Sequence, residues 1–176
     1  APYKSCFFRN DLGVGNATLF TQVATGAWVT AAAASVGAAW GDYDNDGFVD
    51  LVVANASAAG QNEFLYRNDG TGGMGVVNAP PLTSIGGRSY GCSWCDYDGD
   101  GDLDLFVANW NQAGFLFRNE GGGAFFRVTE GEVATTPGSW LGTAWGDYDN
   151  DGDSDLFVSN NYDQNNVLYR HDGGGT

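Results

Sequence analysis

The chain has 176 residues, 28 of them glycine, and its 22 acidic residues against 7 Lys and Arg give a formal net charge of −15. This charge, with no basic stripe, argues against nucleic acid and against an anionic membrane surface as partners. No apolar run reaches the ~18 residues that a membrane-spanning helix needs. Short apolar runs broken by Gly, Asn and Asp clusters predict an all-β chain, since the Ala-rich segment 30–35 is too short to hold a helix alone.

A short aromatic strand that ends in arginine is the first predicted element, and it recurs further along the chain. Its four copies are Cys6–Asp11, Glu63–Asp69, Gly114–Glu120 and Asn166–Asp172. The arginines of these copies are Arg9, Arg67, Arg118 and Arg170. We expect each arginine to end its strand and to pair with an acidic loop or to cap backbone carbonyls.

A longer, aspartate-rich segment lies between these strands in three copies. The copies are Trp40–Asn55, Trp94–Asn109 and Trp145–Asn160, and their first aspartates are 54 and 51 residues apart. Self-similarity at about 50 residues is typical of propellers and stacked arrays, and each repeat holds about four predicted strands, as a propeller blade does. We therefore predict one repeat array over residues 1–176, with approximate repeats 6–63, 64–114 and 115–166 and a partial fourth repeat at 167–176.

Each aspartate-rich segment places Asp at positions 1, 3, 5 and 9 of a loop and Gly at position 6. Alternate side chains of a tight loop can converge on one point, and oxygen ligands of this kind select a hard cation. A flexible shell of about seven oxygens favours Ca²⁺ over Mg²⁺, which prefers octahedral geometry. The predicted ligands of three Ca²⁺ sites, position 7 serving through its backbone carbonyl, are Asp42, Asp44, Asp46, Phe48, Asp50, Asp96, Asp98, Asp100, Asp102, Asp104, Asp147, Asp149, Asp151, Asp153 and Asp155.

Two other interpretations of these loops fit the sequence less well. An EF-hand carries a bidentate Glu at position 12, but this chain has Val53, Val107 and Val158 there, in apolar runs that read as buried strands. A metal-free Asp/Asn/Gly turn is the other interpretation, and three complete copies of the pattern disfavour it. The loops are therefore expected to join strand to strand around a cation.

The motif pair W-G-D-Y-D-N-D-G-D-x-D-L-F-V-x-N and N-x-L-Y-R resembles the FG-GAP (VCBS-type) repeats of integrin α propellers and of many bacterial secreted proteins, over essentially the whole chain. The resemblance implies an all-β fold of tandem four-stranded, propeller-like blades, about three in number, with calcium in the aspartate loops. Three blades cannot close a ring, since propellers need at least four. Three explanations stay open: a segment of a longer propeller, two chains that complete a ring, or head-to-tail stacking into a filament.

Aromatic, cysteine and asparagine residues outside the loops give secondary expectations. Tryptophans at one register, expected to pack between blades, are Trp40, Trp94 and Trp145; those outside it, candidates for a ligand or partner surface, are Trp28, Trp110 and Trp140. Cys92 and Cys95 lie on opposite faces of a regular strand and bridge only if a bulge intervenes, while Cys6 is left free or pairs between chains. Asn16 and Asn55 begin N-glycosylation sequons.

No nucleophile elbow, zinc motif or P-loop is present, and the glutamates outside the loops form no catalytic pattern, so we do not expect an enzyme. The chain opens with Ala1-Pro2-Tyr3-Lys4 rather than a signal peptide, which fits a mature secreted chain or an excised segment. We predict an extracellular, calcium-stabilised β-repeat protein with a structural or adhesive role. Its expected partners are copies of itself or further repeats of a longer chain. A lectin-type module that binds glycans or cell-surface proteins is the alternative, and a repeat region attached to an enzyme is the third reading.

Overall fold

The computed structural model describes residues 6–11, 20–161 and 164–173, and these residues are all-β apart from two four-residue helices. The strands are β1 (Phe7–Asn10), β2 (Phe20–Val23), β3 (Ser35–Gly41), β4 (Asp50–Asn55), β5 (Phe64–Asn68), β6 (Met74–Val77), β7 (Ser89–Cys95), β8 (Asp104–Ala113), β9 (Phe115–Asn119), β10 (Phe125–Val128), β11 (Pro137–Gly146), β12 (Asp155–Asn160) and β13 (Val167–Tyr169). The helices are α1 (Ala27–Thr30) and α2 (Glu132–Thr135). Neither helix is long or apolar enough to cross a membrane.

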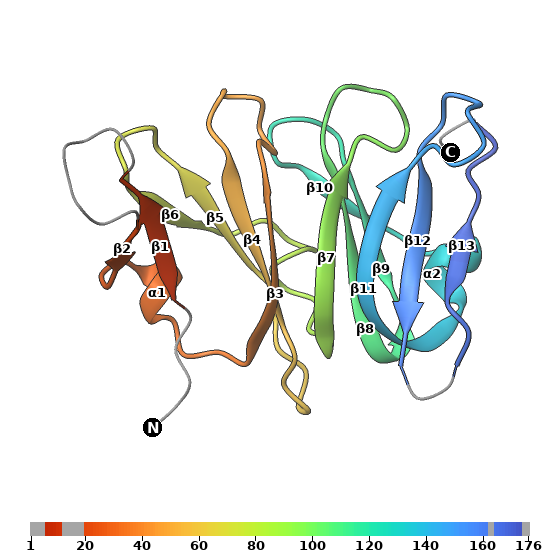
Figure 1. The fold of residues 1–176 in the computed structure, drawn as a ribbon, viewed down its shortest axis with the longest axis horizontal. Helices are drawn as coiled ribbons and strands as arrows, with labels where there is room; N and C mark the ends of the chain where they lie inside the picture. The colour runs from red at the N-terminus through yellow and green to blue at the C-terminus, as the bar shows by residue number, and fades with distance from the viewer. Residues whose placement is uncertain (1–5, 12–19, 162–163, 174–176) are drawn as a thin grey trace.

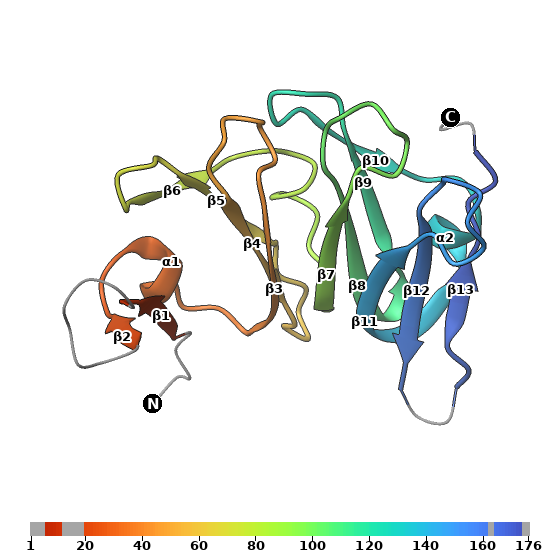
Figure 2. The ribbon, with the colours of Figure 1, turned by 45° about the horizontal axis from the view of Figure 1, so that its top comes forward.

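Sequence neighbours pair antiparallel in each repeat, which gives three small sheets that we call blades. Blade 1 is β3–β4–β5–β6, blade 2 is β7–β8–β9–β10, and blade 3 is β11–β12–β13. Blades 2 and 3 share hydrogen bonds where the end of β8 pairs with the start of β11, while β1 and β2 form a separate two-stranded hairpin. The blades stand side by side in a row and close no ring (Figures 1 and 2).

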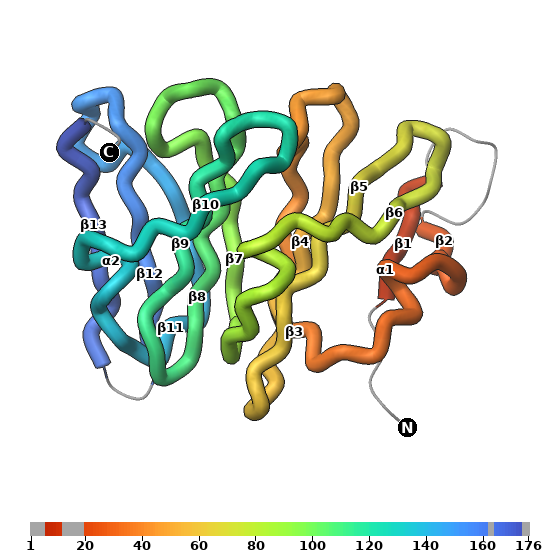
Figure 3. The backbone as a smooth tube through the Cα atoms, turned by 180° about the vertical axis from the view of Figure 1, so that it is seen from behind, coloured from red at the N-terminus to blue at the C-terminus, as the bar shows by residue number. Residues whose placement is uncertain are grey.

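The three aspartate loops connect β3 to β4, β7 to β8 and β11 to β12. All three lie along one edge of the row, at the top of Figure 3. The strand that follows each loop is buried throughout in β4, over its first six residues in β8 and in part in β12. The position-12 valines Val53, Val107 and Val158 are 8%, 0% and 0% exposed. The prediction that the loops join strand to strand is confirmed.

Apolar side chains from facing blades fill the space between them. The cluster between blades 1 and 2 includes Tyr43, Val52, Leu65, Leu105 and Phe117, and the cluster between blades 2 and 3 includes Phe106, Leu116, Trp140, Leu156 and Val158. Successive residues of β8 point to opposite faces, so Phe106 enters one cluster and Val107 the other. Strand β8 therefore contributes side chains to both interfaces between blades.

The first strands of the three blades, β3, β7 and β11, are called the inner strands. They approach one another closely because each carries a glycine at the contact. A Cβ atom added at Gly37 would lie 2.3 Å from the carbonyl oxygen of Tyr90, and one added at Gly91 would lie 2.3 Å from the carbonyl oxygen of Leu141. Such distances are below van der Waals contact, so only glycine permits this spacing of blades.

The tryptophans follow the expected register only in part. Trp94 and Trp145 pack between blades as predicted, whereas Trp40 remains 47% exposed. The expectation that Trp140 lies on a ligand or partner surface is wrong, because its side chain is 3% exposed within the cluster between blades 2 and 3. Trp110 is half-buried beneath Arg88, whose guanidinium carbon lies 5.4 Å from the ring centroid.

The structure also shows where the cysteines and the second N-glycosylation sequon lie. Cys92 and Cys95 are free thiols, because β7 pairs regularly with β8 from Gly91 to its end and no bulge brings the two together. Asn55 is fully buried, and its amide donates to the carbonyl oxygen of Asn62 at 2.7 Å, so the second sequon is shielded in the folded chain. The first sequon, at Asn16, lies outside the described residues.

Replacement of Gly91 by alanine tests the close approach of the inner strands. The new methyl group would meet the carbonyl oxygen of Leu141, so we expect Gly91→Ala to lower the free energy of unfolding by roughly 1–3 kcal/mol. The matched control is Gly146→Ala, since a Cβ atom at Gly146 meets no atom within 4 Å. Equal stability of the two variants in urea titrations would contradict the packing described here.

Candidate metal centre

Three carboxylates converge in each aspartate loop. One oxygen from each of positions 1, 3 and 9 lies within 4.8 Å of the others in all three loops. The groups are Asp42, Asp44 and Asp50; Asp96, Asp98 and Asp104; and Asp147, Asp149 and Asp155. The same three positions meet in every copy, so the arrangement follows from the repeat itself.

The carboxylate at position 1 shapes the loop from inside. Asp42 Oδ1 accepts a hydrogen bond from the backbone N–H of Asp46 at 3.1 Å, and Asp42 Oδ2 accepts one from Gly47 at 2.9 Å. The other two loops repeat both bonds from the equivalent residues. Position 1 therefore curls the chain around the point where the carboxylates meet.

The carboxylate at position 9 ties the loop to the third strand of its blade. Asp104 Oδ2 accepts from the backbone N–H of Tyr97 at 3.0 Å, and Asp104 Oδ1 accepts from that of Asn119, after the arginine of β9, at 2.8 Å. Asp50 and Asp155 make the same pair of bonds. All three carboxylates are at most 1% exposed.

Backbone conformation at position 4 is a feature of the loops that the sequence reasoning missed. The residue there has a positive φ in every loop: 56° at Asn45, 74° at Gly99 and 62° at Asn150. Asn and Gly tolerate this left-handed conformation better than other residues do. An Asn, Gly, Asn series at one position was the signal that could have revealed it.

Position 3 supplies the observation that tests whether a cation fits. Asp44 Oδ1 and Asp98 Oδ1 are buried and have no hydrogen-bond partner. Burying a carboxylate oxygen without a partner is costly, and a cation at the point of convergence would satisfy it. All the atoms that could ligate the metal are oxygens, which suits a hard cation. The residues present therefore fit a divalent metal ion.

Burial of these carboxylates disfavours their charged form. Burial raises the pKa of Asp104 to about 7, and it also raises the pKa values of Asp50 and Asp98 above the usual range. Neighbouring loop aspartates add repulsion in the same direction. A bound cation would remove this penalty, because its charge offsets both effects.

The remaining predicted ligands lie beside the convergent groups. At position 5, Asp46 Oδ1 accepts from the backbone N–H of Phe48 at 2.9 Å, and Asp100 and Asp151 do the same in their loops. Phe48 keeps its side chain 44% exposed. Ligation by positions 5 and 7 stays a prediction.

Arginines at the ends of the third strands meet acidic groups, as expected. Arg67 Nε lies 2.5 Å from Asp44 Oδ2, and its Nη2 lies 2.6 Å from Asp46 Oδ2. Arg170 Nη1 lies 3.6 Å from Asp149 Oδ2, whereas Arg118 pairs with Glu120 instead. Two arginines therefore offset part of the negative charge of their own aspartate loops.

Glu63 is a buried acid outside the loops, at the junction of blades 1 and 2. Ser89 Oγ contacts both Glu63 Oε1 and, at 2.8 Å, Asn109 Oδ1, yet a hydroxyl carries only one proton. A protonated carboxyl satisfies both contacts by donating to Ser89. Burial raises the pKa of Glu63 to about 7, consistent with that state.

Replacement of one position-3 aspartate should raise the melting temperature without metal and lower it with metal. Without a divalent cation, Asp98→Asn relieves repulsion from Asp100 and Asp96, the neighbouring charges that raise the pKa of Asp98, so we expect a higher melting temperature in chelator. With calcium, the lost charged ligand should lower it. Glu130→Gln, an exposed acid outside the loops, is the control. A shift in the same direction under both conditions would rule out a cation at this loop.

Glu63 should make the fold less stable as the pH rises. Its folded pKa, about 7, lies above the reference value of 4.5, so its contribution is complete below pH 4.5 and is lost as the pH rises through 7. Relative to Glu63→Gln, the wild-type chain should lose about 3 kcal/mol of unfolding free energy between pH 4.5 and pH 8. Parallel pH profiles of the two proteins in chelator would show that Glu63 is not protonated in the fold.

Comparison with known proteins supports the repeat architecture. A search of curated proteins found no match to the chain. A family model described as the FG-GAP-like repeat matches residues 42–107 and again residues 96–158. Each match begins at the first aspartate of a loop and ends at the position-12 valine of the next loop. The chain therefore belongs to the FG-GAP-like repeat family.

Proposed function

We propose that this chain is an extracellular β-repeat module whose blades are stabilised by three Ca²⁺ ions and whose role is structural or adhesive. The observation that carries the proposal is the triple recurrence of converging carboxylates whose position-9 member is tied to the third strand. A cation held there would link the loop, the second strand and the third strand of each blade. Its binding energy would then contribute to folding.

Calcium is the cation that this donor set favours. All the converging groups are carboxylates on a loop whose shape is set by backbone N–H groups that donate to the position-1 carboxylate, and such loops accommodate the six to eight oxygens that Ca²⁺ takes. The carboxylates at loop positions 1, 3 and 9 would ligate the ion, and loop positions 5 and 7 would supply further oxygen ligands. Calcium supplies charge neutralisation and cross-linking here.

An extracellular setting suits both the family and the site. Repeats of this family are typical of extracellular proteins. Extracellular calcium modules work with dissociation constants of about 10⁻⁴–10⁻³ M, which the high concentration of calcium outside cells can saturate. The strong negative charge of the chain also keeps it soluble when part of that charge is neutralised.

Two of the acids outside the loops are already engaged by neighbouring side chains. Glu63 is buried against Ser89, and Glu120 is paired with Arg118. A glycosidase needs two carboxylates that face a shared cleft, and neither of these is available for such a role. The lectin alternative is also weakened, because Trp140 is buried and not on a binding surface.

Removal of calcium tests the proposal directly. At a hundredfold excess over the dissociation constant, each site contributes about 2.7 kcal/mol, and 1 kcal/mol shifts melting by about 2–4 °C for a chain of this size. EGTA should therefore lower the melting temperature by more than about 10 °C, and excess Ca²⁺ should restore it.

The control is a triple variant at position 3, Asp44→Asn, Asp98→Asn and Asp149→Asn, which keeps the backbone hydrogen bonds of the position-9 carboxylates and should melt alike with and without calcium. Mg²⁺ in place of Ca²⁺ should restore less stability. An unchanged melting temperature of the wild-type chain in EGTA would contradict the calcium proposal.

A further inference from the structure

The tyrosine at position 2 of each aspartate loop packs into the next blade along the row. Tyr43 stacks on Trp94 of blade 2, with ring centroids 6.5 Å apart and an interplanar angle of 16°. Phe125 lies 6.0 Å away on another side of the ring, and Asn119 Nδ2 donates to the carbonyl oxygen of Tyr43 at 2.7 Å. Three residues of blade 2 therefore form a socket for a tyrosine of blade 1.

The second junction repeats this arrangement. Tyr97 stacks on Trp145 of blade 3, with centroids 6.3 Å apart and an interplanar angle of 11°. His171, which occupies the place of Asn119, lies 5.9 Å from the same tyrosine ring. Insertion of the loop tyrosine is thus the recurring contact between successive blades.

The third loop tyrosine lies at the C-terminal end of the row, where no fourth blade is described. Tyr148 is 54% exposed. Gly142 occupies the place of Gly37 and Gly91 in the inner strand, but a Cβ atom added there would meet only Ser159 Oγ of its own blade, at 2.9 Å. This end therefore presents both parts of a blade junction, the tyrosine and the glycine, without the blade they would contact.

The N-terminal end of the row presents the matching socket. Trp40 precedes the first loop as Trp94 precedes the second, and Asn68 follows the arginine of its strand as Asn119 does. Met74 pairs with Asn68 in the sheet as Phe125 pairs with Asn119. These three residues line a cavity of ≈ 540 Å³, and Trp40 is 47% exposed.

The side-chain amide of Asn68 at this socket can donate a second hydrogen bond. Asn119 Nδ2 donates both to Leu103 of its own blade and to Tyr43 of the preceding one. Asn68 Nδ2 donates to the equivalent carbonyl of its own blade, that of Val49, at 3.1 Å. An amide nitrogen carries two protons, so Asn68 can donate to a tyrosine carbonyl as Asn119 does.

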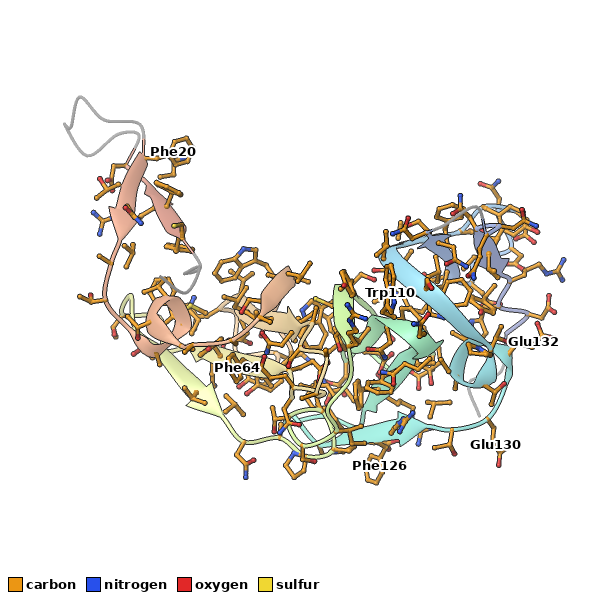
Figure 4. All side chains as sticks on the ribbon, turned by 90° about the horizontal axis from the view of Figure 1, so that it is seen from below. Phe20, Phe64, Trp110, Phe126, Glu130 and Glu132 are labelled. Carbon is orange, nitrogen blue, oxygen red and sulfur yellow. The ribbon has the colours of Figure 1, made fainter. Side chains whose placement is uncertain are left out.

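The β1–β2 hairpin borders the socket without filling it. Phe7 lies edge-on to Trp40, with centroids 5.8 Å apart, and lines the same cavity. The hairpin pairs with no blade strand among the described residues, and it stands away from the row in Figure 4, where Phe20 marks it. Because β1 and β13 are copies of one strand type, they would take the same place where two copies of the chain meet, so the hairpin would have to move aside there.

We propose that copies of this chain associate end to end, with Tyr148 of one copy inserted into the cavity lined by Trp40, Asn68 and Met74 of a second copy. The inference rests on the proposed structural role and names the partner, a second copy of the chain. The two surfaces differ, so each added copy leaves one free socket and one free tyrosine. A contact of this kind extends into a filament unless its rotation closes a ring.

Sedimentation velocity in millimolar calcium tests the contact over a range of chain concentrations. The wild-type chain should form species that grow with concentration. Tyr148→Ser and Gly142→Ala alter the C-terminal end, and Trp40→Ser alters the N-terminal end. Val36→Asp also alters the N-terminal end, because Val36 is 57% exposed and precedes Gly37 as Tyr90, whose carbonyl lies against Gly37, precedes Gly91. Each should shift association to at least tenfold higher concentration. Phe126→Ser removes an equally exposed aromatic, 58% exposed on β10, and should leave association unchanged.

A mixing experiment tests the head-to-tail geometry. Gly142→Ala keeps an intact socket and Trp40→Ser keeps an intact tyrosine, so each alone should be monomeric while their equimolar mixture should form dimers and nothing larger. Thermal melts of all samples in calcium verify folding, and melts of the same samples in EGTA test the calcium role separately. A chain that is calcium-stabilised yet monomeric at the highest concentration, end variants that associate like wild type, or a mixture that stays monomeric would overturn the proposal.

Discussion

The carboxylate at position 9 of each loop holds together two parts of a blade that are distant in the chain. Asp104, for example, accepts one backbone N–H from its own loop and one from the end of β9, fifteen residues further on. A buried carboxylate that accepts two N–H groups fixes both donors, because an alternative without them would leave the charge unsatisfied. The loop conformation and the register of the third strand both depend on this interaction.

The same interaction gathers negative charge where it is hardest to tolerate. Three carboxylate oxygens lie within 4.8 Å of one another in each loop, and one of the three carboxylates is buried. Arg67 and Arg170 offset part of that charge, but the buried oxygens of Asp44 and Asp98 keep no hydrogen-bond partner. Three divalent cations would bring the net charge from −15 to −9. The fold therefore prepares sites whose stability depends on what fills them.

Local spacing predicted most of the repeat, because its determinants lie close together in sequence. The aspartate spacing predicted the convergence of positions 1, 3 and 9, and the apolar runs predicted the strands that flank each loop. Contacts between blades were harder to foresee. Trp140 is buried by side chains of both blades 2 and 3, in the cluster between them. Trp40 stays exposed because the described residues include no preceding loop tyrosine to cover it. Glu63 is buried by contacts with the neighbouring blade, and no local sequence pattern predicts such contacts.

Calcium stoichiometry tests the account most directly. Isothermal titration of the chelator-treated chain with CaCl₂ should saturate at three ions per chain, and the Asp98→Asn variant should lose one strong site while it keeps the other two. Heat release that saturates below three ions, or the same stoichiometry and affinity in the wild type and the variant, would contradict the claim that each converging set of carboxylates holds a cation.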